Sequence, residues 1–208
     1  MSETFIKLPS KAGEPAWEAA YLLPTQGHWS EEDFLQLQTN RLAELVNGSL
    51  EVLPTPSWLH QLILEFLFDE MRAYVRSQNL GGKVLVAPLP VRLFPGTIRE
   101  PDLLYVTPAN FPQDVRGYPT KIDLAVEIVS SGVEAHQRDY IDKRVDYAKA
   151  AISEYWIVDP EQQLITVLGL CETAYETLGE YRAGQSATSR YWPGFAIAVD
   201  RILSIGKN

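Results

Sequence analysis

Two carboxylates and one lysine of this 208-residue chain have the types and spacing of a catalytic site. Asp102 follows a proline at the start of the apolar segment PDLLYV, and Glu127 lies 25 residues further on (127 − 102). Glu127 is in the middle of LAVEIVSS, residues 124–131, which is typical of a buried strand. Because an unpaired carboxylate costs several kcal/mol in apolar surroundings, the sequence predicts a charged partner for Glu127.

Two carboxylates on adjacent strands are what a hard divalent cation requires. Mg²⁺ prefers oxygen ligands and commonly uses one or two carboxylates, with waters and substrate phosphate oxygens completing the octahedron. We therefore expect Asp102 and Glu127 to be metal ligands, with the main-chain carbonyl of Ile128 as a third, and with Mn²⁺ as the alternative cation. This set of groups is typical of metal-dependent phosphodiester hydrolysis.

The lysine lies on a predicted amphipathic helix, residues 136–152. Asp139, Lys143 and Tyr147 are spaced i, i+4, i+8, so they lie along one side of that helix. Lys143 is expected at the edge of an apolar face, which is formed by Tyr140, Ile141, Val145, Ala148 and Ile152. From there it can point toward the preceding strand, where a lysine can orient or deprotonate an attacking water and stabilise transition-state charge.

Three further residues are accessory candidates: Glu44, His60 and Asp139. Glu44 alternates with apolar neighbours in a predicted strand, so it can face inward and supply a carboxylate or bond to His60. His60 lies on the apolar side of a long predicted helix, where a packing role is the default interpretation. Asp139 is placed on the same helix side as Lys143.

Structural interpretations of the same residues stay open. Asp102 can be an ordinary strand-start residue, and Glu127 can be a structural carboxylate bonded to a nearby serine or a buried arginine. Asp139 and Lys143 can be a surface ion pair, which contributes only about 0.3–0.5 kcal/mol.

The elements that must position these residues begin with an irregular arm, residues 1–28, rich in Pro, Gly and small residues. Ser30 is a predicted helix N-cap with acidic residues after it. Two apolar runs joined by Asn47-Gly48 predict an N-terminal β-hairpin. Ser57 can cap a helix that runs to about Gln78 and is apolar nearly all round, which is typical of a buried helix.

Strands are predicted near residue 84 and over 91–94, 101–106 and 121–129. After the helix at 136–152, two more strands are predicted over 154–159 and 164–170, with small peripheral strands in the tail. The pattern contains no interdomain linker, so residues 29–208 are expected to form one domain. The fold class is α/β (α+β), with a mixed, antiparallel-leaning central sheet flanked by helices.

Composition limits the partners. The net charge of −9 argues against broad binding of a polyanion, because Lys and Arg supply most of the affinity for nucleic acid. A basic groove would have to be local, and the candidates for it are Lys83, Arg92, Arg99, Arg138, Arg144 and Lys149. The single cysteine excludes an intramolecular disulfide. The absence of a long apolar run or signal peptide predicts no membrane partner and a cytoplasmic location.

Three segments, REPDLLYV, LAVEIVSS and RDYIDKRVDYAKAAISEYWIVDP, together resemble the Uma-two restriction endonuclease family of the PD-(D/E)xK nuclease superfamily. The upstream RLAELVNGSLEVLPTPSWLHQLI resembles its N-terminal hairpin and first core helix, so the resemblance covers about residues 30–200. It implies a restriction-endonuclease-like core and a Mg²⁺-dependent endonuclease whose substrate is DNA.

The resemblance also implies roles for individual residues. Asp102 and Glu127 would bind Mg²⁺, and a lysine would complete the site. The superfamily pattern has this lysine two residues after the glutamate, where this chain has Val129. In the family the lysine is on the following helix, and the matching residue is Lys143.

Two other functions stay open. A catalytically inactive nuclease-fold protein, kept for binding or scaffolding, is favoured by the charge of −9 and by the displaced lysine. A glycosidase-like carboxylate-pair hydrolase requires two carboxyl groups of unlike pKa, but the lysine and the lack of an aromatic sugar platform count against it. By analogy with nucleases that cut both strands, we expect a homodimer.

Overall fold

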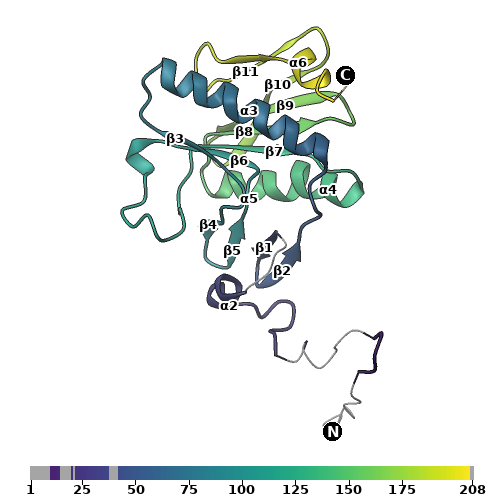
Figure 1. The fold of residues 1–208 in the computed structure, drawn as a ribbon. Helices are drawn as coiled ribbons and strands as arrows, with labels where there is room; N and C mark the ends of the chain where they lie inside the picture. Colours follow the sequence, from purple (N-terminus) through teal and green to yellow (C-terminus); the bar gives the residue numbers. More distant parts are fainter. Residues whose placement is uncertain (1–9, 15–19, 21, 38–41, 207–208) are drawn as a thin grey trace.

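A six-stranded mixed sheet forms the centre of the computed structural model, which describes residues 10–14, 20, 22–37 and 42–206 (Figure 1). Its spatial order is β10 (Ala174–Tyr181), β9 (Leu164–Cys171), β8 (Glu154–Asp159), β7 (Leu124–Ile128), β6 (Leu103–Val106) and β3 (Lys83–Val86). Strands β7 and β8 pair in parallel, and the other neighbours in this sheet pair antiparallel. The sheet therefore has the mixed, antiparallel-leaning character that the sequence predicts.

Helices cover both faces of this sheet. The long α3 (Trp58–Ser77) packs on one face, and a helical run packs on the other. This run comprises α4 (Val133–Gln137), the π-helical η2 (Arg138–Asp142) and α5 (Lys143–Lys149). It forms the crossover between β7 and β8, as parallel neighbours require. The crossover therefore packs on the face of the sheet toward which the odd-numbered side chains of β7 point.

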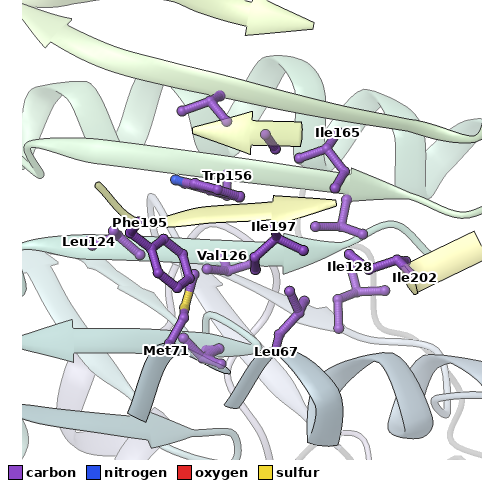
Figure 2. Packing of buried hydrophobic residues seen from close by; sticks show 14 of the residues in the cluster. Leu67, Met71, Leu124, Val126, Ile128, Trp156, Ile165, Phe195, Ile197 and Ile202 are labelled. Atoms are coloured by element: carbon purple, nitrogen blue, oxygen red, sulfur yellow. The ribbon is translucent and has the colours of Figure 1, made fainter. Parts of the chain in front are cut away.

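Alternation along the strands sorts the core into two layers. Leu124, Val126 and Ile128 of β7 pack with Leu67 and Met71 of α3, together with Trp156 and residues of the C-terminal segment (Figure 2). Ala125 and Val129 pack on the opposite side, in the cluster that includes Tyr147 of α5. Because successive side chains of a strand point to opposite faces, Glu127 lies on the α5 side.

A second sheet has four strands in the order β2-β1-β5-β4. Its members are β1 (Ala43–Val46), β2 (Ser49–Val52), β4 (Val91–Phe94) and β5 (Thr97–Arg99). Asn47 and Gly48 both have positive φ, +49° and +76°, as the predicted tight hairpin requires. Helix α2 (Glu31–Gln36) adjoins this sheet and begins with a capping box between Ser30 and Asp33.

The remaining elements are short. They are η1 (Pro108–Asn110), β11 (Ser186–Thr188), β12 (Ala196–Ala198) and α6 (Val199–Leu203), with β11 and β12 paired antiparallel. The α+β class and the central sheet flanked by helices are thus confirmed. The arm predicted at residues 1–28 falls partly outside the described residues, and the boundary at 28/29 stays a prediction. Within the described part of the chain, no helix is long and apolar enough to cross a membrane.

Two helix predictions are wrong in detail. Helix α3 is not buried all round: Trp58 is 80% exposed, and the helix covers the sheet with one face only. Part of the apolar face expected for the helix at 136–152 is exposed, since Ile141 is 51% and Val145 62% exposed, whereas Ala148 and Ile152 are buried as expected. A π-helical segment precedes Lys143, and the buried residues of the run include Asp139 and Lys143 beside Ala135, Tyr147 and Ala148.

Candidate active site

The pairing of β6 with β7 places Asp102 beside Glu127. Leu103 pairs with Val126 in an antiparallel register, so Asp102, one residue before β6, lies opposite Glu127. The carboxylate of Asp102 accepts a hydrogen bond of 2.8 Å from the main-chain N–H of Ile128 and lies 3.2 Å from His60 Nε2. Asp102 is therefore held between the end of β7 and the first turn of α3.

Glu127 is buried, with 3% of the residue exposed. Tyr147 donates a hydrogen bond of 2.5 Å to its Oε1, and the ammonium of Lys143 lies 2.8 Å from its Oε2. The charged partner that the sequence requires is thus Lys143. Among the described residues, the partners of Glu127 are therefore Lys143 and Tyr147, and not a serine or a buried arginine.

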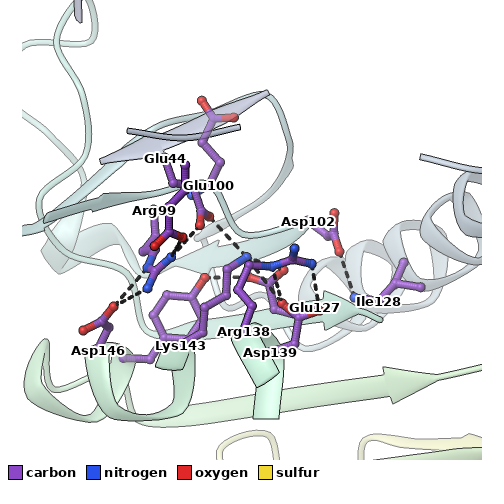
Figure 3. Close-up of polar contacts among 12 residues, drawn as sticks. Glu44, Arg99, Glu100, Asp102, Glu127, Ile128, Arg138, Asp139, Lys143 and Asp146 are labelled. Atoms are coloured by element: carbon purple, nitrogen blue, oxygen red, sulfur yellow. Dashed lines mark hydrogen bonds and ion pairs between the residues drawn. The ribbon is translucent and has the colours of Figure 1, made fainter. Parts of the chain in front are cut away.

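Lys143 points into the protein and not to solvent (Figure 3). Besides Glu127, its Nζ lies 3.2 Å from Glu44 and 3.9 Å from Asp139. Lys143 and Asp139 are 1% and 0% exposed, so the interpretation of this pair as a surface ion pair is wrong. A π-helical turn, η2, ends immediately before Lys143, and such turns are frequent at functional sites.

The charge state of Lys143 follows from its neighbours. Burial disfavours the ammonium, but the negative charges of Glu127, Glu44, Asp139 and Asp102 more than offset burial and raise the pKa of Lys143 above its ordinary value. Lys143 is therefore protonated at neutral pH. An ammonium can stabilise negative charge, but it has no free lone pair with which to accept a proton.

Glu44 connects the hairpin sheet to this centre. It is fully buried, and its carboxylate accepts hydrogen bonds of 2.8 Å from both Arg99 Nη1 and the main-chain N–H of Glu100. Burial opposes its ionisation, yet Lys143, Arg99 and the Glu100 N–H together lower the pKa of Glu44. Arg99 also contacts Asp146 at 2.7 Å. Glu44 therefore acts as an ionised link between β1, β5 and α5.

The basic residues proposed from sequence as a DNA groove are mostly engaged within the fold. Arg99 is 1% exposed and pairs with the buried Glu44 and the partly buried Asp146. Arg92 pairs with Glu31 at 2.6 Å, and Lys149 lies over the ring of Phe94. Arg138 pairs with Asp139 and also lines the cavity described next. Among the described residues, Arg138 is the member of this basic set that lines the cavity.

A small cavity lies between the two carboxylate strands and α5. Its volume is about 20 Å³, which is room for one water-sized species. Its polar lining consists of His60, Glu100, Asp102, Glu127, Ser130, Arg138 and Lys143. Ile128 also lines it, although the Ile128 group with a defined contact to Asp102 is the N–H. The cavity thus brings together the three residues that the sequence singles out and His60.

Glu100 is the cavity residue that sequence reasoning missed. It is 8% exposed, and its Oε2 atom is buried without a hydrogen-bond partner. Burial first, and then the nearby charge of Glu44, raises the pKa of Glu100 from 4.5 to about 7. Glu100 is in the short link between β5 and β6, which bends at Asp102, so strand alternation could not have identified it.

The site holds more acidic side chains than basic ones. Three permanent cations stand against seven carboxylates in this network. The cations are Arg99, Arg138 and Lys143, and the carboxylates are Glu44, Glu51, Glu100, Asp102, Glu127, Asp139 and Asp146. Burial, reinforced by neighbouring carboxylates, raises the pKa of Glu127 although Lys143 opposes the shift. A further cation would relieve this repulsion.

The donor set fits a hard divalent cation. The residues that line the cavity include Glu100, Asp102 and Glu127, and carboxylate oxygens are the ligands that such a cation prefers. Each carboxylate oxygen has two lone pairs, so Glu127 can accept from Lys143 and still bind a cation. Among the described residues, no three Asp, Glu, His or Cys side chains already form a metal-binding group. The cavity is therefore a carboxylate-lined space and not a preassembled metal centre.

The raised pKa of Glu100 gives a stability prediction. The folded state holds the Glu100 proton more tightly than the unfolded state, so stability falls as pH rises from 4.5 through about 7. Glu100→Gln removes this ionisation. We expect the variant to be more stable than the natural protein by about 2 kcal/mol at pH 8 in EDTA, with little difference at pH 4.5.

Urea unfolding at the two pH values measures this effect. Glu134→Gln is the matched control, because Glu134 is exposed on α4 and outside the cavity. Equal stability of Glu100→Gln and the natural protein at pH 8 would show that Glu100 is not held in an unfavourable environment.

Comparisons with known proteins give the family and the fold of the chain. The model of the Uma2 family, described as "Putative restriction endonuclease", matches residues 31–200. The fold is similar to the crystal structure of "a putative nuclease belonging to DUF820" from Anabaena variabilis, with a TM-score of 0.67 and 16% identity. That similarity covers 87% of this chain and 98% of the other, and it shows a shared fold. No curated protein sequence matches the chain.

Proposed function

Because the chain belongs to the Uma2 family, described as "Putative restriction endonuclease", we propose that it is a Mg²⁺-dependent endonuclease that hydrolyses phosphodiester bonds of DNA. One observation carries the proposal: the carboxylates of Asp102 and Glu127 and the ammonium of Lys143 line a single small cavity. Oxygen donors next to a fixed positive charge suit a reaction that binds a cation and develops charge on phosphate oxygens.

In this proposal Asp102 and Glu127 hold the cation, with the main-chain carbonyl of Ile128 as a third ligand. Mg²⁺, or Mn²⁺ in its place, supplies Lewis acidity toward the phosphate and lowers the pKa of a bound water. His60 is a positioning residue: its Nε2 contacts Asp102 at 3.2 Å, and this contact fixes the carboxylate at the end of β7.

Lys143 has an electrostatic role in the proposal. Its raised pKa keeps it protonated, so it does not deprotonate the attacking water. The ammonium, fixed by Glu44 and Glu127 on a rigid helix, stabilises negative charge that develops on the phosphate. Of the three roles that the sequence left open for this lysine, orientation of the water and charge stabilisation are favoured over proton abstraction.

The non-catalytic alternative is also supported by one observation. Lys143 and Tyr147 already contact both oxygens of Glu127, at 2.8 and 2.5 Å. Such a centre can be a buried ion-pair network that stabilises a fold kept for binding DNA or another protein. The two functions differ in one measurable respect, since the non-catalytic protein neither binds a divalent cation in the cavity nor cuts DNA.

The test is cleavage of supercoiled plasmid and linear genomic DNA by the purified chain. We expect open-circular and linear products with 10 mM Mg²⁺ or 1 mM Mn²⁺, roughly saturating levels for carboxylate-bound cations, and no products in EDTA. Cleavage that persists in EDTA would contradict a metal-dependent mechanism. DNA binding without cleavage under every metal condition would favour the non-catalytic alternative. The predicted homodimer is checked on the same sample by sedimentation.

A further inference from the structure

Arg138 and Lys143 are the arginine and lysine side chains that line the cavity within the described part of the chain, and they differ in exposure. The side chain of Lys143 is 1% exposed, and three acids, Glu44, Glu127 and Asp139, lie within 3.9 Å of its ammonium. The side chain of Arg138 is 16% exposed. Arg138 is therefore the cation of the cavity that solvent, and hence a substrate, can reach.

The mouth of the cavity is the side at which Asp102 and Arg138 meet solvent, since each of these side chains is 16% exposed. The cavity itself, of about 20 Å³, has room for one water-sized species. A phosphodiester group is larger than a water molecule, so a substrate phosphate has to bind at the mouth. Because the chain carries a net charge of −9, a polyanion is repelled unless a basic group is present at that place.

Asp139 fixes the guanidinium of Arg138 without using all of its donors. Its carboxylate accepts hydrogen bonds of 2.9 Å from Nε and 3.1 Å from Nη2, which Figure 3 marks with dashed lines. A guanidinium has five N–H donors, and among the described residues no acceptor contacts Nη1. The ion pair therefore orients the guanidinium and leaves the Nη1 group available for a further acceptor.

We propose that Arg138 binds the substrate phosphate at the mouth of the cavity, with Nη1 as a donor to a phosphate oxygen. This inference rests on the proposed function, because the phosphate belongs to the proposed DNA substrate. A guanidinium matches the geometry of phosphate oxygens, and its charge strengthens the hydrogen bond. Lys143 lies inside the cavity and stabilises charge without this contact, so the two cations have different roles.

The test is the binding of a fluorescently labelled DNA duplex to the full-length chain in EDTA, followed by anisotropy over a range of salt concentrations. We expect Arg138→Gln to weaken binding by about 10-fold at low salt, because a hydrogen bond between charged groups is lost. The slope of log K against log salt concentration should become shallower by about 0.9, the value for one phosphate contact. A purely structural role of Arg138 would not change this slope.

Two variants control for charge. Arg76→Gln removes the same charge from an exposed residue of α3 outside the cavity, and it should keep the slope of the natural protein. Arg138→Lys keeps a positive charge at the mouth and should also keep the slope. If Arg138→Gln is not folded by circular dichroism, Arg138→Gln/Asp139→Asn, which removes both members of the ion pair, replaces it and should show the same shallower slope.

The outcomes separate this inference from the proposed function. If the natural protein cuts DNA and Arg138→Gln binds the duplex with unchanged affinity and slope, Arg138 does not bind the phosphate, although the proposed function stands. If the natural protein neither binds nor cuts DNA under any metal condition, both are overturned. If DNA is cut in Mg²⁺ but not bound in EDTA, the KM for cleavage at several salt concentrations replaces anisotropy, with the same expected differences between variants.

Discussion

Exchanging Asp102 for asparagine is expected to lower the rate of Mg²⁺-dependent DNA cleavage by about 10³-fold or more while the protein stays folded. Asparagine has the size of aspartate, and its Oδ1 can still accept the hydrogen bond from Ile128 N–H. The substitution removes the charge that binds the cation. A loss of several kcal/mol of transition-state stabilisation corresponds to about three orders of magnitude in rate.

Plasmid cleavage over a range of Mg²⁺ concentrations measures this effect. Asp114→Asn is the matched control, because Asp114 is exposed and outside the cavity. It should cleave at the rate of the natural protein. If Asp102→Asn cleaves DNA within about 10-fold of the natural rate, the loss is below about 1.4 kcal/mol, and Asp102 is not a metal ligand.

Exchanging Lys143 for methionine is expected to affect both stability and activity. The ammonium lies within 3.2 Å of Glu44 and Glu127, and all three groups are buried. Removal of one partner from a buried pair leaves the other uncompensated, so we expect a loss of about 3–5 kcal/mol. In a chain of this size, that loss lowers the melting temperature by roughly 10 °C. DNA cleavage should fall below detection.

The pH dependence of this loss has a defined sign. Because its pKa is raised, Lys143 stabilises the fold fully below pH 10.5, the ordinary pKa of lysine. This stabilisation is lost only as the pH rises above that value. The carboxylates it faces can be neutralised by protons at low pH. The destabilisation by Lys143→Met should therefore be larger at pH 8 than at pH 5, and thermal unfolding at both values measures the difference.

Two variants control this experiment. Lys149→Met changes an exposed lysine of the same helix and should alter stability by less than about 1 kcal/mol. The double variant Lys143→Met/Glu127→Gln removes both members of the pair and should recover part of the lost stability. An unchanged melting temperature in Lys143→Met would show that the ammonium is not a stabilising part of the buried network.

Much of the fold could be predicted because local and global signals agree. The apolar run in LAVEIVSS predicts a buried strand, and Asn47-Gly48 predicts the hairpin turn, in which both residues have positive φ values. Ser30 and Ser57 accept the N-terminal hydrogen bonds of α2 and α3 as their sequence positions indicate. These features depend on a few neighbouring residues, which is why they can be read from sequence.

The helix that carries Lys143 was harder to orient. Apolar periodicity placed Ile141 and Val145 toward the core, but both are exposed. The buried side carries Asp139, Lys143 and Tyr147, because their partners on β7 and β1 are charged. Periodicity assumes that the core is apolar. At this site the core is an ion-pair network, which apolar spacing cannot detect.

Glu100 illustrates a different limit. Its sequence neighbour Asp102 is indicated as a site residue by the proline before it, and Arg99 by its charge. The glutamate between them has the sequence features of a surface residue. Glu100 is buried where the hairpin sheet meets the central sheet. Its N–H donates a hydrogen bond to Glu44 of β1 there. Strands β1 and β5 pair although about 50 residues of sequence separate them, so no local pattern predicts that burial.

The central claim, that the cavity between β6, β7 and α5 binds a divalent cation through Asp102 and Glu127, is tested most directly by diffraction. Crystals of the protein soaked in millimolar Mn²⁺ would be measured at the manganese absorption edge. We expect an anomalous peak inside the cavity, about 2.2 Å from carboxylate oxygens of Asp102 and Glu127, close to the bond lengths of hard cations. An empty cavity, or a peak bound only at surface carboxylates, would contradict the claim.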